Sequence, residues 1–417
     1  MKTIEGHDVK IFTDNIEENA LEQIKELLSI DVFSDKKIRI MPDVHAGAGC
    51  VIGFTGDLGD KVIPNIVGVD IGRGMRILNL GKLADIDYHA FHEHIRGNVP
   101  SGKIVREDKF GFKPLVGEEM EIYREAKSLV TELYCYRELK DSGRINKAIG
   151  SLGGGNHFIE LDKDDDGNVY LVIHTGSRNL GKQVAEIYQA KAVKHLTAGA
   201  DEFEETIKRT IEEYKAAGRR SELQDVIKKM RKEHKAAEPS LPADLCYVEG
   251  EAREHYLHDM RICQRWAVLN RKLISLLLMR FFPDVAVLEE FESVHNYISD
   301  DNIIRKGSIS AAGGERCIIP LNMRDGSLLC TGKGNPDWNY SAPHGAGRVL
   351  SRTQAYEKIT MEDFEASMQG IYSESVNDFT RDESPMVYKP ASEIIANIGD
   401  TVTIDTIIRP IFNFKAS

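Results

Sequence analysis

One histidine, set in a turn of small residues, is the side chain in this sequence best suited to covalent chemistry. Residues 341–348 read SAPHGAGR and place His344 before two glycines and a cation. Glycines let backbone N–H groups approach an anion closely, and a helix predicted over 348–356 would add its positive end. Because a neutral imidazole can take up a phosphoryl group, the turn could hold a nucleophile and the phosphate that it attacks. The alternative is a loop histidine that caps a helix.

Two further glycine-rich turns carry a carboxylate. Residues 41–49 read MPDVHAGAG, which puts Asp43 and a histidine at the end of a predicted strand. Residues 67–75 read VGVDIGRGM and place Asp70 in a turn after an apolar run. Such loops bring the backbone close to a ligand. An aspartate in a turn, however, more often bonds to its own backbone.

Three histidines from distant segments could converge on a metal ion. His157 lies in NHFIE (156–160), His174 ends the next predicted strand, and His295 comes from far along the chain. Imidazole is a common ligand of transition metals, but no compact spacing supports a metal independently, and burial explains each histidine equally well. On a strand, Asn156 and Glu160 share one face, and His157 and Glu160 point to opposite faces.

The elements that position these residues mix helices and strands without regular alternation. Apolar periodicity predicts helices over 14–30, 85–96, 118–140 and 249–279, strands over 37–41, 50–56, 75–80, 157–161 and 169–174, and a mostly helical stretch over 181–237. This order favours an α+β fold over a doubly wound sheet. We expect a single domain over 1–417, with a helical excursion at 181–245 on a β-rich core.

Composition bounds the class of protein. The chain has 417 residues, 41% hydrophobic and 29% charged, and a net charge of −12. No apolar run approaches the roughly 20 residues that span a bilayer, and the amino terminus has no signal-peptide pattern. The six cysteines show no paired spacing, so we expect a reduced, cytoplasmic protein. The negative charge argues against non-specific coating of nucleic acid but allows a local basic groove.

Six motifs in one order give the chain its resemblance to a known family. They are PDVH (42–45), VGVDIG (67–72), GNHFIE (155–160), HTGSR (174–178), HN (295–296) and HGAGR (344–348). In these motifs the chain resembles the RtcB family, the GTP- and manganese-dependent RNA-splicing ligases, from about residue 41 to 415. The resemblance implies one large RtcB-like domain.

The resemblance also implies roles for individual residues. His344 matches the histidine that the family guanylylates, and Asp43 matches an acid at the catalytic centre near the RNA ends. The metal ligands of the family match Asp70, His157, His174 and His295. The positions that hold the guanylate match Asn156, His157, Phe158, Ile159, Glu160, His295, Asn296, Pro320, Leu321, Asn322, Met323, Ser327, His344, Gly345, Ala346, Gly347 and Lys415. Our candidates for contacts to RNA phosphates are Arg178, Arg348 and Arg352.

The implied activity is GTP-dependent joining of RNA 3′-phosphate or 2′,3′-cyclic phosphate ends to 5′-hydroxyl ends, in RNA repair or tRNA splicing. The implied cofactors are GTP and one or two Mn²⁺ ions, and the partners are broken RNA and an archease-type activator, with no membrane. Two alternatives stay open. The protein could guanylylate RNA 3′-phosphates without sealing them, or it could bind RNA or metal without catalysis.

Two departures from the family pattern bear on these expectations. Where the family has a cysteine that bridges both metals, this chain has Arg73. A guanidinium cannot ligate a cation, so Arg73 either pairs with Asp70 or holds a phosphate, and the second metal site is in doubt. Cys50 in the neighbouring glycine loop is a candidate replacement thiolate. The family's Pro-Gly-Ser-Met-Gly loop reads PLNMR at 320–324, which bears on nucleotide affinity and choice.

Overall fold

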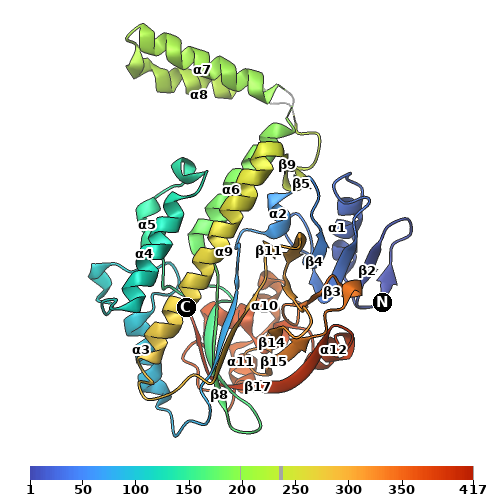
Figure 1. Ribbon diagram of the computed structural model, residues 1–417, viewed down its shortest axis with the longest axis vertical. Helices are drawn as coiled ribbons and strands as arrows, with labels where there is room; N and C mark the ends of the chain where they lie inside the picture. Colours follow the sequence, from blue (N-terminus) through green and yellow to red (C-terminus); the bar gives the residue numbers. More distant parts are fainter. Residues whose placement is uncertain (198, 234–237, 417) are drawn as a thin grey trace.

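Two β-sheets form the frame of the molecule, a computed structural model that describes residues 1–197, 199–233 and 238–416 (Figure 1). The six-stranded sheet has the order β1 (Lys2–Thr3), β2 (Val9–Ile11), β3 (Ile38–His45), β4 (Ile52–Asp57), β12 (Ile303–Lys306) and β11 (Tyr297–Ile298). The seven-stranded sheet has the order β10 (Glu289–Val294), β6 (Gly74–Asn79), β8 (Val169–Thr175), β7 (Phe158–Lys163), β17 (Val402–Lys415), β15 (Gly326–Gly332) and β14 (Arg316–Asn322). Two short pairs, β13 (Ser308–Ser310) with β16 (Ser341–Pro343) and β5 (Lys61–Val62) with β9 (Val248–Glu249), complete the strands of the described residues.

The seven-stranded sheet curls until its two edge strands meet. Arg316 on β14 forms an ion pair of 3.0 Å with Glu289 on β10, and its guanidinium lies over the ring of Phe291 on the same strand, 5.4 Å from the centroid. The side chains of both edges therefore close a nearly complete barrel. Mixed helices and strands around this sheet confirm the predicted α+β fold.

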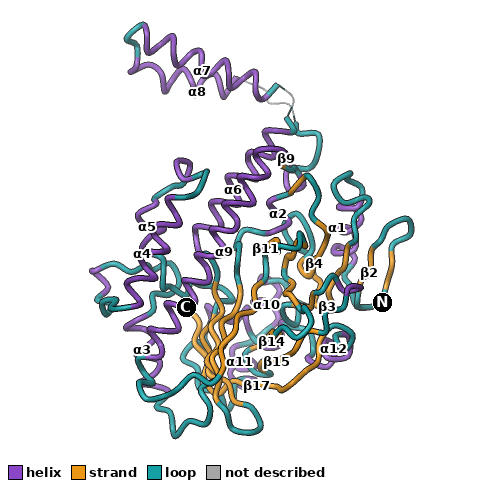
Figure 2. Tube along the Cα trace, viewed as in Figure 1, coloured by secondary structure: helices purple, strands orange, loops and turns teal. Residues whose placement is uncertain are grey.

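Helices cover one side of the curled sheet (Figure 2). The central one is α9 (Gly250–Met279), which has 30 residues and a length of about 45 Å. It packs against β8 and β6 and against the neighbouring helices α3 (Tyr88–Asn98), α4 (Glu118–Thr131) and α6 (Arg178–His195). From Trp266 to Leu278 most of its residues are buried, so this half of the helix lies inside the molecule.

The helical stretch after residue 178 divides into two parts. α6 belongs to the body of the molecule, because Val184 and Tyr188 are buried in its main core. α7 (Ala200–Ala216) and α8 (Leu223–Glu233) instead extend beyond the ends of α6 and α9 (Figure 1). The helices of the described residues do not combine the length and apolar character of a membrane span.

Most predicted elements are present, with shifted ends. α1 (Glu18–Leu28), β3, β4, β6, β7 and β8 lie within or beside their predicted ranges. The predicted helix over 348–356 is wrong: α10 (Arg352–Lys358) begins four residues later. Ser351 caps it with a reciprocal side-chain bond to Gln354, and Val349 instead donates its N–H to Val387, 2.8 Å away. The turn at His344 is therefore not a helix N-terminus.

Four shorter α-helices are the remaining α-helices of the described residues. α2 (Pro64–Val67) precedes the Asp70 turn, α5 (Ser142–Lys147) precedes β7, and α11 (Met361–Ser367) and α12 (Ala391–Asn397) lie between the His344 turn and β17. These elements place β3, β7, β16 and β17 so that their ends meet, and the predicted site lies there.

Candidate active site

His344 follows β16 and is held by a carboxylate from β3, 301 residues away in the sequence. The Nδ1 of His344 lies 2.7 Å from the Oδ2 of Asp43. Because a carboxylate can only accept, Nδ1 carries the proton, and the lone pair of the neutral ring is on Nε2. The backbone N–H of His344 donates to the same Oδ2 at 3.2 Å. The pair therefore fixes both the tautomer and the position of the imidazole.

The turn after His344 requires glycine where it crosses β3. Gly347 has a φ of +79°, and a Cβ there would lie 2.5 Å from the backbone oxygen of Asp43. This close crossing brings the two chain segments together. The N–H groups of residues 345–347 donate to no acceptor in the described ranges, so they are available to an anion without the helix that the sequence predicted.

A cavity opens beside His344. Most of the predicted guanylate positions line it: Asn156, Phe158, Glu160, Pro320, Leu321, Asn322, Met323, Ser327, His344, Gly345, Ala346, Gly347 and Lys415. Four predicted positions, His157, Ile159, His295 and Asn296, are not among its lining residues. Ile159 is buried in the main core, and Asn296 accepts the N–H of Gly307 at 2.8 Å behind the wall.

The last strand brings a cation to the cavity. Lys415 on β17 pairs in register with Phe158 on β7, and its ammonium lies 5.5 Å from the centre of that ring. Its Nζ is also 3.4 Å from a carboxylate oxygen of Glu383. Burial opposes ionisation of Glu383, but Lys415, Tyr388 and two arginines lower the pKa of that carboxyl. The Glu383 carboxyl is therefore ionised at neutral pH.

Glu160 is an acidic residue of the cavity wall, and its charge depends on pH. Burial raises its pKa to about 7, although the ammonium of Lys415 and a hydrogen bond from Asn413 oppose the shift. Asn413 on β17 donates to its carboxylate in the interior of the sheet. At physiological pH this group exchanges between a hydrogen-bond acceptor and a donor.

A tight hairpin supplies the opposite wall. Pro320 pairs with Ser327 across β14 and β15, and Asn322 pairs with Gly326. The Oδ1 of Asn322 accepts the N–H groups of Arg324 and Asp325, 3.0 and 2.8 Å away. Residues 320–324, which depart from the family pattern, therefore belong to a turn that Asn322 stabilises with two hydrogen bonds.

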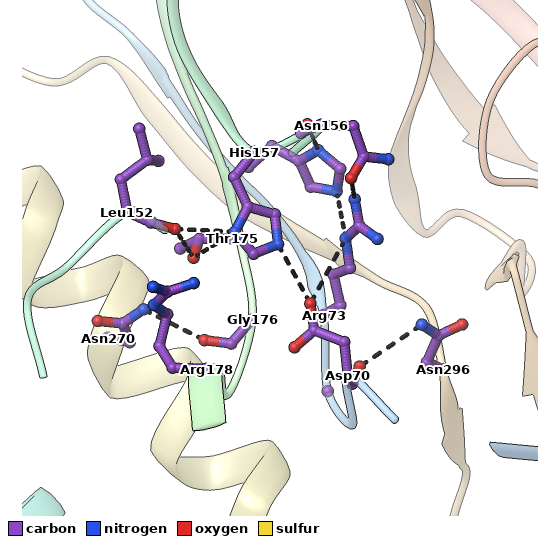
Figure 3. Close-up of polar contacts among 12 residues, drawn as sticks. Asp70, Arg73, Leu152, Asn156, His157, Thr175, Gly176, Arg178, Asn270 and Asn296 are labelled. Atoms are coloured by element: carbon purple, nitrogen blue, oxygen red, sulfur yellow. Dashed lines mark hydrogen bonds and ion pairs between the residues drawn. The ribbon is translucent and has the colours of Figure 1, made fainter. Parts of the chain in front are cut away.

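Arg73 lies between Asp70 and Asn156 (Figure 3). Its Nε lies 3.3 Å from the Nε2 of His174. Because the guanidinium can only donate, Nε2 accepts, and the Nδ1 of His174 donates to the carbonyl of Asn156 at 3.2 Å. A second guanidinium nitrogen bonds to the Oδ1 of Asn156. Both nitrogens of His174 are thus engaged, and burial moves its pKa well below the usual value, so the ring is neutral.

Asp70 and His157 form the second half of the predicted metal centre (Figure 3). The Oδ2 of Asp70 is 3.1 Å from the Nε2 of His157 and 3.7 Å from the Nε of Arg73. The other ring nitrogen of His157 donates to the carbonyl of Leu152 at 2.8 Å. Burial raises the pKa of Asp70, but His157, Arg73 and Arg178 more than offset it, so this carboxyl is ionised.

His295 differs from the other two histidines. It is 1% exposed, and neither ring nitrogen has a hydrogen-bond partner in the described part of the chain. Its ring lies 4.8 Å from that of His344 and 5.4 Å from that of His174. An unpartnered buried imidazole is costly, and a ligand that accepts from it or coordinates it would remove the cost.

These residues do not fit a two-metal centre. Across the described ranges, no three His, Cys, Asp or Glu side chains are arranged to hold one ion. The lone pair of His174 faces a guanidinium, whose charge repels a metal ion at this distance. Burial raises the pKa of the Cys50 thiol to about 11, which disfavours the thiolate form that the family's bridging ligand takes.

The three predicted RNA-binding arginines are engaged within the protein. Arg178 donates to the carbonyl of Gly102 at 2.9 Å, and Arg348 donates to the carbonyl of Asp382 at 2.7 Å. Arg352 bonds to the carboxylate of Asp382, yet about half of its side chain is exposed. Of the three, Arg348 lines the cavity, and Arg352 has the side chain most exposed to solvent.

Three lining residues were absent from the predicted site: His45, Glu383 and Tyr388. His45 had a signal, because it lies two residues after Asp43, and residues at that spacing on a strand share a face. Its Nδ1 donates to the carbonyl of Asp43 at 3.0 Å. Glu383 and Tyr388 carried no motif, and long-range folding alone brings them to the cavity.

Comparison with known proteins matches this chain to one family. The family model described as tRNA-splicing ligase RtcB matches residues 23–416. The chain is 28% identical to the RNA-splicing ligase RtcB of Escherichia coli (strain K12), over 99% of this chain and 98% of that protein. It is 27% identical to the tRNA-splicing ligase RtcB of Aeropyrum pernix, over 89% of this chain and 86% of that protein. The sequence motifs, the cavity that they line and the extent of these matches show that the chain belongs to the RtcB family of RNA-splicing ligases.

Proposed function

We propose that this protein is a GTP-dependent RNA ligase that works through a guanylylated His344. It joins RNA ends bearing a 3′-phosphate or 2′,3′-cyclic phosphate to 5′-hydroxyl ends. One observation carries the proposal. Asp43 holds the Nδ1–H of His344 at 2.7 Å, which leaves the Nε2 lone pair on a side chain that lines a cavity together with most of the guanylate positions that the family resemblance implies.

In the first step, the Nε2 of His344 attacks the α-phosphorus of GTP. A P–N bond forms, the bond to the bridging oxygen breaks, and pyrophosphate leaves with the electron pair. Positive charge develops on the imidazole, and the carboxylate of Asp43 stabilises it through the Nδ1 hydrogen bond. The N–H groups of residues 345–347 and the ammonium of Lys415 offset charge on the phosphates.

In the second step, an oxygen of the RNA 3′-phosphate attacks the bound guanylate and displaces His344, which regains its neutral form. The RNA then carries a 3′-diphosphoguanosine end. A 5′-hydroxyl attacks the RNA-side phosphorus, its proton passes to a base, and GMP leaves as a phosphodiester forms. The side chain of Asp43 is 0% exposed and turned to His344, so we assign it to the nucleophile and not to the incoming hydroxyl.

His45 is placed better than Asp43 for that hydroxyl. It lines both the nucleotide cavity and the adjoining surface groove of Arg348 to Gln354. Since its Nδ1 donates to Asp43, its Nε2 carries the lone pair. Burial lowers the pKa of His45, which keeps the ring unprotonated and able to accept a proton at neutral pH.

Glu160 favours guanine in the cavity. The Watson–Crick edge of guanine presents two adjacent N–H donors, which suit a carboxylate acceptor, whereas adenine presents an acceptor there. The acid lies on the face of β7 that carries Phe158, whose ring offers a stacking surface for a base. We therefore propose GTP over ATP.

The test uses the full-length protein with α-labelled GTP or ATP, then RNA with 3′-phosphate and 5′-hydroxyl ends. We expect label from GTP on His344, none on His344→Ala, transfer to the RNA 3′ end, and a joined product. Label on RNA without joining would replace the proposal with end capping. No label on His344 under any divalent ion would leave a non-catalytic RNA-binding protein.

A further inference from the structure

We propose that the Arg73 guanidinium takes the place of one divalent cation behind the wall of the nucleotide cavity, so that the site binds at most one metal ion. The inference rests on the proposed function, because it concerns the charge that the nucleotide meets. The family resemblance implies metal ions at this site, and the inference replaces one of them with a cation that is part of the protein.

The contacts of Arg73 are those of a cation among ligands. Its nitrogens meet a ring nitrogen of His174 at 3.3 Å, the amide oxygen of Asn156 and a carboxylate oxygen of Asp70 at 3.7 Å. Each partner offers a lone pair, and together they carry one negative charge. A guanidinium, which is planar and always protonated near neutral pH, satisfies all three at once.

The same contacts exclude a metal ion from this position. The lone pair on the Nε2 of His174 is used, since Nδ1 donates to the carbonyl of Asn156. A second cation beside Arg73 would meet its full charge in a buried setting, where screening is weak. The donors left for an ion are the Nε2 of His157 with Asp70 beside it, 3.1 Å apart, and His295.

Arg73 also prepares the wall that faces the nucleotide. Asn156 and His174 both line the cavity, so the guanidinium lies one side chain behind its surface. Because Arg73 takes the amide oxygen of Asn156, the amide nitrogen of that side chain remains as a donor for a phosphate or ribose oxygen. The positive charge and the oriented donor both favour an anionic ligand at this wall.

The test counts bound ions in the holoprotein and does not depend on turnover. The wild type, Arg73→Cys and Arg73→Lys are saturated with Mn²⁺ and a non-hydrolysable GTP analogue, freed of excess ion, and measured by elemental analysis and by electron paramagnetic resonance. We expect no more than one ion in the wild type and in Arg73→Lys. Arg73→Cys should gain one ion and show the spin coupling of neighbouring Mn²⁺ ions.

Two ions in the wild type would overturn the inference, and so would a folded Arg73→Cys that gains none. Circular dichroism establishes folding, and if Arg73→Cys does not fold, the wild-type count decides. Failure of the proposed function looks different: His344 would take no guanylate in the wild type or in Arg73→Lys, whatever number of ions they bind.

Discussion

Replacing Asp43 with asparagine separates the charge behind the nucleophile from its geometry. The Oδ2 of Asp43 accepts both the Nδ1–H and the backbone N–H of His344. The amide oxygen of asparagine can take both bonds, so His344 keeps its tautomer and its place. What disappears is the negative charge that faces the imidazole as it bonds to phosphorus.

The size of the effect follows from that hydrogen bond. Bonds to charged groups contribute about 1.5–3 kcal/mol, against about 1 kcal/mol for neutral ones. The change therefore removes about 1 kcal/mol of transition-state stabilisation, which is a loss of about fivefold in rate. The new NH₂ group replaces Oδ1, an atom without a hydrogen-bond partner among the described residues, so folding stability should fall by about 1–3 kcal/mol as well.

Single-turnover loading of His344 with labelled GTP measures this rate. We expect the maximal rate to fall and the half-saturating GTP concentration to stay nearly constant, because Asp43 lies outside the cavity lining. Asp405→Asn, a change of the same type at an exposed ion pair with Arg316, is the matched control. A loss below threefold for Asp43→Asn, or one confined to GTP affinity, would refute the assignment of Asp43 to charge stabilisation.

Three other perturbations test the remaining parts of the site. Glu160 has a pKa of about 7 because of burial, so GTP affinity should rise between pH 6 and pH 8 in the wild type and stay level in Glu160→Gln, as measured with a fluorescent analogue. Because the pKa of Glu160 is raised above its usual value of 4.5, ionisation of the buried carboxyl lowers folding stability as pH rises from about 4.5 to about 7. Glu160→Gln should therefore melt at a higher temperature than the wild type at pH 8. An equal difference in melting temperature at pH 5 and at pH 8 would contradict this. Gly347→Ala forces a Cβ to 2.5 Å from the Asp43 backbone oxygen and should lower stability by about 1–3 kcal/mol in denaturant unfolding, whereas Gly313→Ala, with open space around it, should not. Cys50 has a thiol pKa of about 11, so iodoacetamide at pH 8 should leave it unmodified in the native protein, and rapid alkylation there would restore it as a candidate thiolate.

Local periodicity predicted the elements and part of the cavity wall. The alternation of side chains along β7 sends Phe158 and Glu160 to the cavity, and it sends Ile159 into the core, where its apolar side chain is fully buried. The family resemblance named all three as guanylate positions. The strand geometry therefore refines the list, since a residue between two lining positions on a strand must face the other way.

The local sequence pattern did not predict the contacts between residues that are far apart in the chain. Nothing near residue 344 indicates that His344 meets Asp43, and nothing near Glu383 indicates that it pairs with Lys415 on the last strand. The helix over 348–356 failed for a local reason. Its apolar and charged residues suit a helix, but Ser351 is a better N-cap than the residues before it, and residue 349 finds a backbone partner in Val387.

At Arg73, the residue type supports one conclusion and the structure adds a second. The residue type alone says that no metal is bridged at that position, and it leaves open a pair with Asp70 or a contact with phosphate. The structure adds His174 and Asn156, so the guanidinium engages a lone pair that a metal would otherwise need. A guanidinium cannot dissociate or exchange, whereas a bound ion can do both. The wall charge of this cavity should therefore persist in chelator, and nucleotide affinity that survives removal of divalent ions in the wild type but falls in Arg73→Met would locate that charge on Arg73.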